Sequence, residues 1–350
     1  MKKKCNECAE QKISVGGQAL IEGIMMQGPK GAALSVRLPD GTIETEELEV
    51  KHLRDKFKPA GWPIIRGIVN MVESLLFGMK CMEKSAEKAG IDDDIPEEEM
   101  SKLDKWLSDH FGPKMMTVIT VISAILGMLL AFVLFTYLPS IIVDKADEYI
   151  FNNALKNIHP LFEGILRMII FVIYIWLVSR MKDIKRVFMY HGAEHKSIFC
   201  YEAGLELTVE NVKKQSRFHP RCGTSFIFVI LIISILISSL LVVIFPGIDA
   251  NRAIWMVVKL SILPLIVGIG YEFIKYAGKH DNVVVRFFSA PGLLMQRLTT
   301  QEPTDDIIEV GIESIKAVLY GMPEKAQGEE SVDSADIVAD ENANAEEQGN

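Results

Sequence analysis

Four long apolar stretches interrupt an otherwise polar chain. They cover residues 115–138, 161–178, 226–246 and 253–274. Each reaches the roughly 17–25 residues that a helix needs to cross the hydrocarbon core of a bilayer. The pattern therefore predicts a polytopic membrane protein with four transmembrane helices and direct contact with the lipid bilayer.

The basic residues between these stretches predict the orientation. The 179–225 loop carries nine Lys and Arg residues, whereas the 139–160 loop carries two and the 247–252 loop carries one. Basic residues close to spans favour the cytoplasmic side. We therefore expect a multi-pass protein of the cell membrane with the 179–225 loop and both termini in the cytoplasm.

Two shorter patterns precede the first span. Residues 34–48 alternate around Pro39-Asp40-Gly41, which is typical of a β-hairpin turn. Residues 62–88 place apolar positions at helical spacing opposite a polar face, which predicts an amphipathic helix. The expected fold class is mainly α, with a small α/β-containing N-terminal cytoplasmic region.

Charge and composition indicate how the chain is organised outside these elements. The net charge is −9, and residues 323–350 are acidic and lack aromatic residues, which predicts a disordered tail. No basic stripe with interleaved aromatics occurs, which disfavours a nucleic-acid-binding protein. The expected organisation has five parts. A flexible N-terminus (1–12) precedes an N-terminal cytoplasmic region (13–114) and a transmembrane domain (115–276). A cytoplasmic C-terminal segment (277–322) and the disordered tail (323–350) follow.

The stretch "YHGAEHKSIFC" (190–200) carries the main candidate chemistry. In a helix His191 and His195 lie one turn apart on one face, and Glu194 lies on its flank. The order His-x-x-Glu-His is the inverted zinc-hydrolase signature, in which the histidines bind metal and the glutamate is the general base. A polar helix face without metal is the alternative.

A catalytic zinc site needs a third protein ligand. Four residues are candidates, and we rank Glu272 and His219 first, then Glu202, and Cys222 last. Two arginines, Arg221 and Arg286, are expected to orient an anionic or carbonyl-containing substrate.

Four motifs together resemble a known family. They are "GGQALIEGIMMQGP" (16–29), "YHGAEHKSIFCYE" (190–202), "HPRCGTSF" (219–226) and "PGLLMQRLTTQEP" (291–303). In this order they are similar to the YqhQ-like family of bacterial membrane proteins, over about residues 13–320. The family is described as predicted metal-dependent enzymes, so the resemblance implies a cytoplasm-facing polytopic membrane protein with a metal site.

The sequence is compatible with three functions. The leading hypothesis is a zinc-dependent hydrolase at the cytoplasmic membrane face, acting on an unknown protein or small molecule. The alternative is a non-enzymatic membrane scaffold or assembly factor whose polar cluster binds a partner. A transporter ranks third, because the spans contain few charges near their midplane and no clear inverted repeat.

Overall fold

The structure is a computed structural model. It describes residues 15–50, 53, 58–90, 115–152, 154–155, 158–220, 222–277, 280 and 282–322. The predicted flexible N-terminus and acidic tail lie outside the described residues.

The N-terminal region begins with a four-stranded antiparallel meander. Its strands are β1 (Gly16–Leu20), β2 (Gly23–Gly28), β3 (Gly31–Arg37) and β4 (Ile43–Leu48), paired in that order. The predicted hairpin is confirmed as β3–β4. Its turn is closed by a hydrogen bond from the Leu38 amide to the Thr42 carbonyl, at 2.9 Å.

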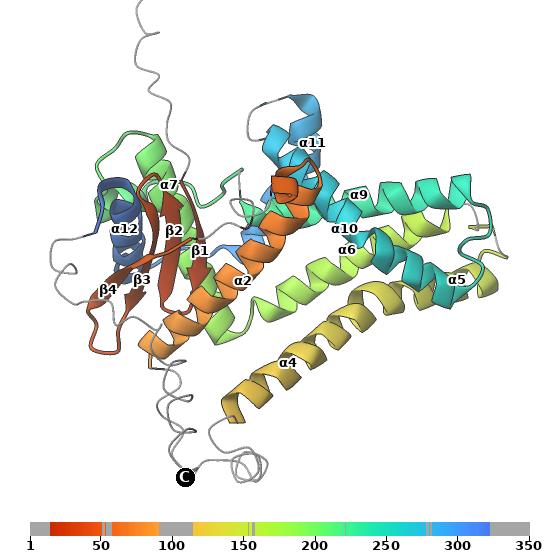
Figure 1. The fold of residues 1–350 in the computed structure, drawn as a ribbon, viewed down its shortest axis with the longest axis horizontal. Coiled ribbons are helices and arrows are strands. Elements are labelled where there is room, and N and C mark those ends of the chain that lie inside the picture. Colours follow the sequence, from red (N-terminus) through yellow and green to blue (C-terminus); the bar gives the residue numbers. More distant parts are fainter. Residues whose placement is uncertain are drawn as a thin grey trace, which may run out of the picture.

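Helices cover both faces of this sheet (Figure 1). The amphipathic helix predicted at 62–88 is confirmed as α2 (Ile65–Lys88), and its Cys81 packs against one face. Helices α7 (Lys182–Glu202) and α12 (Asp305–Tyr320) pack against the other. Strand alternation sends Leu20, Met25, Leu34 and Val36 toward α2, and Ile24, Met26 and Ala33 toward α7 and α12. Three segments far apart in sequence thus form one α/β unit.

The membrane part has four helices that are long and apolar enough to cross a bilayer, as predicted. The first combines α4 (Met115–Phe132), a π-helical turn η3 (Val133–Tyr137) and α5 (Leu138–Tyr149). Pro139 has no N–H for the carbonyl one turn earlier, which explains the π turn before it. The others are α6 (His159–Val178), α9 (Gly223–Ile244) and α10 (Arg252–Ala277). Large apolar side chains on them face outward, as contact with lipid requires; examples are Ile125, Leu129, Ile173, Leu240 and Leu260.

An ion triad of Glu163, Arg167 and Lys259 joins α6 to α10. Glu163 and Arg167 lie one helical turn apart on α6, and their charged side chains are 3.0 Å apart. Lys259 was not predicted as a member, yet its Nζ lies 2.5 and 2.6 Å from the two carboxylate oxygens of Glu163. Charges inside a membrane bundle need such partners, so the triad fixes the packing of these two helices.

Three short or peripheral elements complete the described fold, namely η1 (Lys58–Gly61), α8 (Val209–Lys213) and α11 (Val283–Thr299). Helix α11 lies against α9, where a Cβ on Gly292 would come within 2.4 Å of the Ser225 backbone. This close approach directs the C-terminal end of α11 toward α7 and toward the start of α9.

Candidate metal site between α7 and the start of α9

Two histidines of α7 and one cysteine form a compact His/Cys cluster. The members are His191, His195 and Cys222, whose potential ligand atoms all lie within 4.8 Å of one another. The His191 Nε2 is 3.3 Å from the Cys222 Sγ, and the two imidazole ring centroids are 4.4 Å apart. Cys222 reaches the histidines because it is the N-cap of α9, where its sulfur also accepts from the Thr224 amide.

Backbone carbonyls fix the orientation of both imidazole rings. The Nδ1 of His191 lies 2.8 Å from the Thr299 carbonyl oxygen, and the Nδ1 of His195 lies 2.6 Å from the Arg217 carbonyl oxygen. A carbonyl oxygen only accepts, so each Nδ1 carries the proton and each Nε2 keeps its lone pair. Metal-binding histidines in proteins are held in this way by an outer hydrogen bond.

The two carbonyl-bearing segments are themselves held by buried side chains. The Gln296 amide of α11 accepts from the His219 backbone N–H and donates to the His219 carbonyl, both at 2.7 Å. Buried Lys196 donates to the Lys213 carbonyl at 2.9 Å and pairs with Glu302 at 2.9 Å. These contacts tie α7, the 213–222 segment and the end of α11 into one support for the cluster.

Glu194 lies beside the cluster and is buried against the sheet. The backbone N–H groups of Gly17 and Ala19 in β1 donate to its carboxylate. A Cβ on Gly17 would come within 2.7 Å of the Met25 carbonyl oxygen and within 3.2 Å of the Glu194 carboxyl carbon, so a side chain at this position would force its surroundings to shift. Burial raises the pKa of Glu194 to about 7, while the neighbouring His191 acts in the opposite direction.

Burial also keeps the nearby imidazoles neutral. It is the main reason why the pKa of His195 falls to about 3, with His191 adding to the shift. The pKa of His219 falls to about 4, again because of burial. A neutral imidazole is the form that binds a metal ion.

The other ligand candidates occupy different places. His219 packs next to His195 with ring centroids 5.6 Å apart, and its Nε2 faces Glu202 at 3.7 Å, outside the ligand group. Glu272, which ranked first with His219, accepts two hydrogen bonds from Arg66 of α2, at 2.6 and 2.5 Å. The structure therefore brings Cys222, ranked last, to the histidines and engages Glu272 in an ion pair.

The two substrate-orienting arginines stay predictions. Arg221 lies outside the described residues. Arg286 lies on an exposed position of α11.

The carbonyl supports of the histidines were not found from the sequence, because a backbone acceptor leaves no side-chain signal. Cys222 was one of the four candidate ligands, but no local pattern indicated that its side chain would contact His191.

A prediction concerns Gly192, which lies within α7 on the side that faces the segment after α11. A Cβ on Gly192 would lie 2.1 Å from the Gln301 carbonyl oxygen. Gly192→Ala must therefore push this segment away and move the Thr299 carbonyl from His191. We expect a loss of about 1–3 kcal/mol in the free energy of unfolding and weaker metal binding, measured by thermal unfolding and by metal titration.

Gly127→Ala provides the matched control for this variant. Gly127 is also helical, and nothing lies within 4 Å of a Cβ placed there. Replacing a helical glycine with alanine in open space is neutral or stabilising. Equal effects of the two substitutions would show that the contact with Gln301 does not constrain the site.

Fold and site together define a class: a polytopic helical membrane protein in which an α/β unit and the membrane helices share a cluster of two histidines and a cysteine. The chain belongs to the family described as "Protein of unknown function (DUF1385)", whose model matches residues 62–320. It is 35% identical over 310 residues to the "Uncharacterized protein YqhQ" of Bacillus subtilis (strain 168), covering 87% of this chain and 92% of that protein. The resemblance to YqhQ-like proteins is thereby confirmed. No solved structure matches the chain.

Proposed function

We propose that this protein is a membrane-embedded, zinc-dependent hydrolase whose site lies where α7 meets the start of α9. His191, His195 and Cys222 are the proposed ligands, and Glu194 is the proposed general base. The observation that carries the proposal is the pair of Nδ1 contacts to backbone carbonyls, which leaves both Nε2 lone pairs beside the Cys222 sulfur.

The donor set suits zinc. Two imidazole nitrogens and one thiolate are ligands that zinc accepts readily, and three protein ligands leave one coordination position for water or substrate. Zinc held there supplies Lewis-acid activation of water and of a substrate carbonyl or phosphoryl group. A polar helix face without a metal would not require both imidazoles to have the same tautomer, with the Nε2 lone pairs free near one thiol.

The other roles in the proposed hydrolysis fall to residues near the metal ligands. Glu194, next to His195 in sequence and held by the Gly17 and Ala19 amides, takes a proton from the attacking water and passes it to the leaving group. The β1 strand that holds this carboxylate also closes the site on the side of the sheet. By the orientation predicted from the basic loops, the site faces the cytoplasm.

Metal content tests the ligand set directly. We expect about one equivalent of zinc in the detergent-purified wild-type protein and none in the His191→Ala/His195→Ala double variant. Cys222→Ser is expected to weaken zinc binding by more than the about 10–100-fold that loss of an outer hydrogen bond costs. Elemental analysis and competition with a chromogenic chelator measure these quantities.

Two further variants decide between the candidate third ligands. Glu272→Gln and His219→Gln should retain the metal, because Glu272 pairs with Arg66 and His219 lies outside the ligand group. Loss of zinc from Glu272→Gln with retention in Cys222→Ser would instead make Glu272 the third ligand. Wild-type protein that binds no zinc, while folded, would favour the scaffold alternative.

A further inference from the structure

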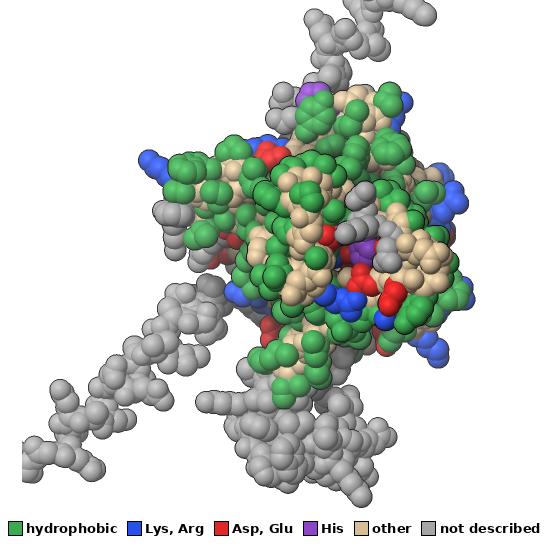
Figure 2. Space-filling view, turned by 90° about the vertical axis from the view of Figure 1, so that its right-hand side faces the viewer, with side chains coloured by type: hydrophobic (Ala, Val, Ile, Leu, Met, Phe, Trp, Pro, Cys, Tyr) green, Lys and Arg blue, Asp and Glu red, His purple; other side chains and the backbone are tan. Residues whose placement is uncertain are grey.

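A second polar site lies at the other end of the molecule, away from the α/β unit. A pocket of about 320 Å³ opens where α5, the start of α6 and the α9–α10 connection meet. Figure 2 looks onto this end of the molecule, and histidine and acidic side chains gather there in a hollow surrounded by apolar side chains. Its volume is at the lower end of the range of about 300–1,000 Å³ for ligand pockets.

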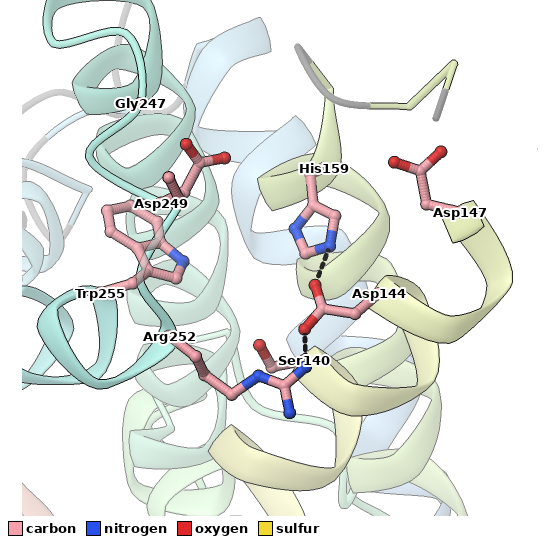
Figure 3. Close-up of a pocket in the computed structure, with 9 residues that line it drawn as sticks. Ser140, Asp144, Asp147, His159, Gly247, Asp249, Arg252 and Trp255 are labelled. Atoms are coloured by element: carbon pink, nitrogen blue, oxygen red, sulfur yellow. Dashed lines mark hydrogen bonds and ion pairs between the residues drawn. The ribbon is translucent and has the colours of Figure 1, made fainter. Parts of the chain in front are cut away.

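One part of the pocket is already neutralised. The His159 Nε2 lies 2.7 Å from one carboxylate oxygen of Asp144, and Arg252 binds the other oxygen (Figure 3). A ring nitrogen this close to a carboxylate oxygen carries the proton, which assigns the proton to the His159 Nε2. In the neutral ring the His159 Nδ1 is therefore an acceptor.

Besides the His159 Nε2, whose contact with Asp144 is an ion pair without hydrogen-bond geometry, two buried nitrogen atoms in the pocket have no hydrogen-bond partner among the described residues. They are the Nδ1 of His159 and the Nε1 of Trp255, whose residues are 9% and 2% exposed. Figure 3 shows both nitrogens directed into the space between the two rings. Buried polar atoms are almost always hydrogen-bonded. An acceptor and a donor thus face this space without a partner in the described part of the chain.

Two further carboxylates line the pocket. Asp147 accepts a hydrogen bond from the Leu155 amide at 2.9 Å, and Asp249 lies across the space from His159 (Figure 3). Within the described part of the chain, neither is within ion-pair distance of a basic side chain. The pocket therefore offers negative charge, the His159 Nδ1 as an acceptor and the Trp255 N–H as a donor, while the Arg252 guanidinium at its edge is paired with Asp144.

We infer that this pocket binds an ethanolamine-type group, that is, a primary ammonium close to an oxygen acceptor. The ammonium has three N–H donors for Asp147, Asp249 and the His159 Nδ1. The oxygen accepts from the Trp255 indole N–H. A quaternary ammonium has no N–H donor, and a neutral glycerol group has no positive charge, so the pocket should discriminate against both.

The same chemistry can come from a lipid headgroup or from a free compound. The pocket lies at the ends of membrane-spanning helices, where headgroups are located, and phosphatidylethanolamine carries the required group. Free O-phosphoethanolamine carries it in water.

Native mass spectrometry of the full chain in detergent tests the inference. Phosphatidylethanolamine is expected to bind at least about 10-fold more tightly than phosphatidylcholine or phosphatidylglycerol, because charged hydrogen bonds to the ammonium are lost in both. Free O-phosphoethanolamine is added as a competitor. Competition identifies a site open to the free compound, and selective lipid binding without competition identifies a headgroup site; both outcomes support the inference.

Variants assign the binding to this pocket. Asp147→Asn/Asp249→Asn should weaken the preferred lipid by about 10-fold or more, whereas Glu148→Gln on the exposed side of α5 should not change it. Trp255→Phe keeps a ring and removes the donor, and about 5-fold weaker binding is expected even if the double variant does not fold. Equal binding of the three lipids without competition, or unchanged selectivity in folded variants, would overturn the inference.

Discussion

Glu194→Gln is expected to abolish hydrolysis while zinc stays bound. The amide is isosteric with the carboxylate but cannot accept a proton at neutral pH. Loss of a positioned general base lowers a hydrolytic rate by about 10²–10⁴-fold. The zinc-loaded wild-type protein and the variant should be compared on small chromogenic esters, amides and phosphoesters, with zinc content measured on the same samples.

The control for this experiment is on the same helix. Asp183 lies in the exposed first turn of α7, two helical turns before His191, and Asp183→Asn removes a carboxylate without touching the cluster. Its rate and its zinc content should equal those of the wild-type protein. If Glu194→Gln hydrolyses as fast as wild type, or if wild type shows no zinc-dependent hydrolysis, the scaffold interpretation replaces the hydrolase.

Glu163→Gln is expected to cause the largest loss of stability in the membrane part. The Glu163 side chain is 2% exposed, and it is the shared anion of Arg167 and Lys259. Its removal leaves two cations next to each other among apolar helices. Breaking a buried ion pair from one side costs about 3–5 kcal/mol, which thermal unfolding in detergent can measure.

Two comparisons isolate the charge effect. Glu163→Gln/Lys259→Gln removes one of the two cations as well, so it should be more stable than Glu163→Gln alone. Glu148→Gln breaks the exposed pair with Lys145 and should change stability by no more than about 1 kcal/mol. A double variant less stable than Glu163→Gln would show that Lys259 stabilises the bundle independently of Glu163.

The membrane spans, the hairpin and helix α2 could be predicted from the sequence because each depends on the residues of one local segment. A spanning helix must be apolar along its whole length, so the four spans follow from composition within one window. The β3–β4 hairpin and helix α2 likewise follow from Pro39-Asp40-Gly41 and from a periodic apolar face. Helix α12 was not distinguished from the rest of the 277–322 segment. Its apolar side faces a sheet that lies near the other end of the sequence.

The candidate site was likewise predicted only in part from the sequence. The sequence by itself determined that His191, Glu194 and His195 lie near one another on one side if the segment is a helix, because their spacing is about one helical turn. Only the tertiary structure decided that Cys222 joins them, that Glu272 pairs with Arg66, and that the Thr299 and Arg217 carbonyls fix the imidazoles. A ligand set depends on distances between segments that are far apart along the chain, and these distances are set by how α9 and α11 pack against α7.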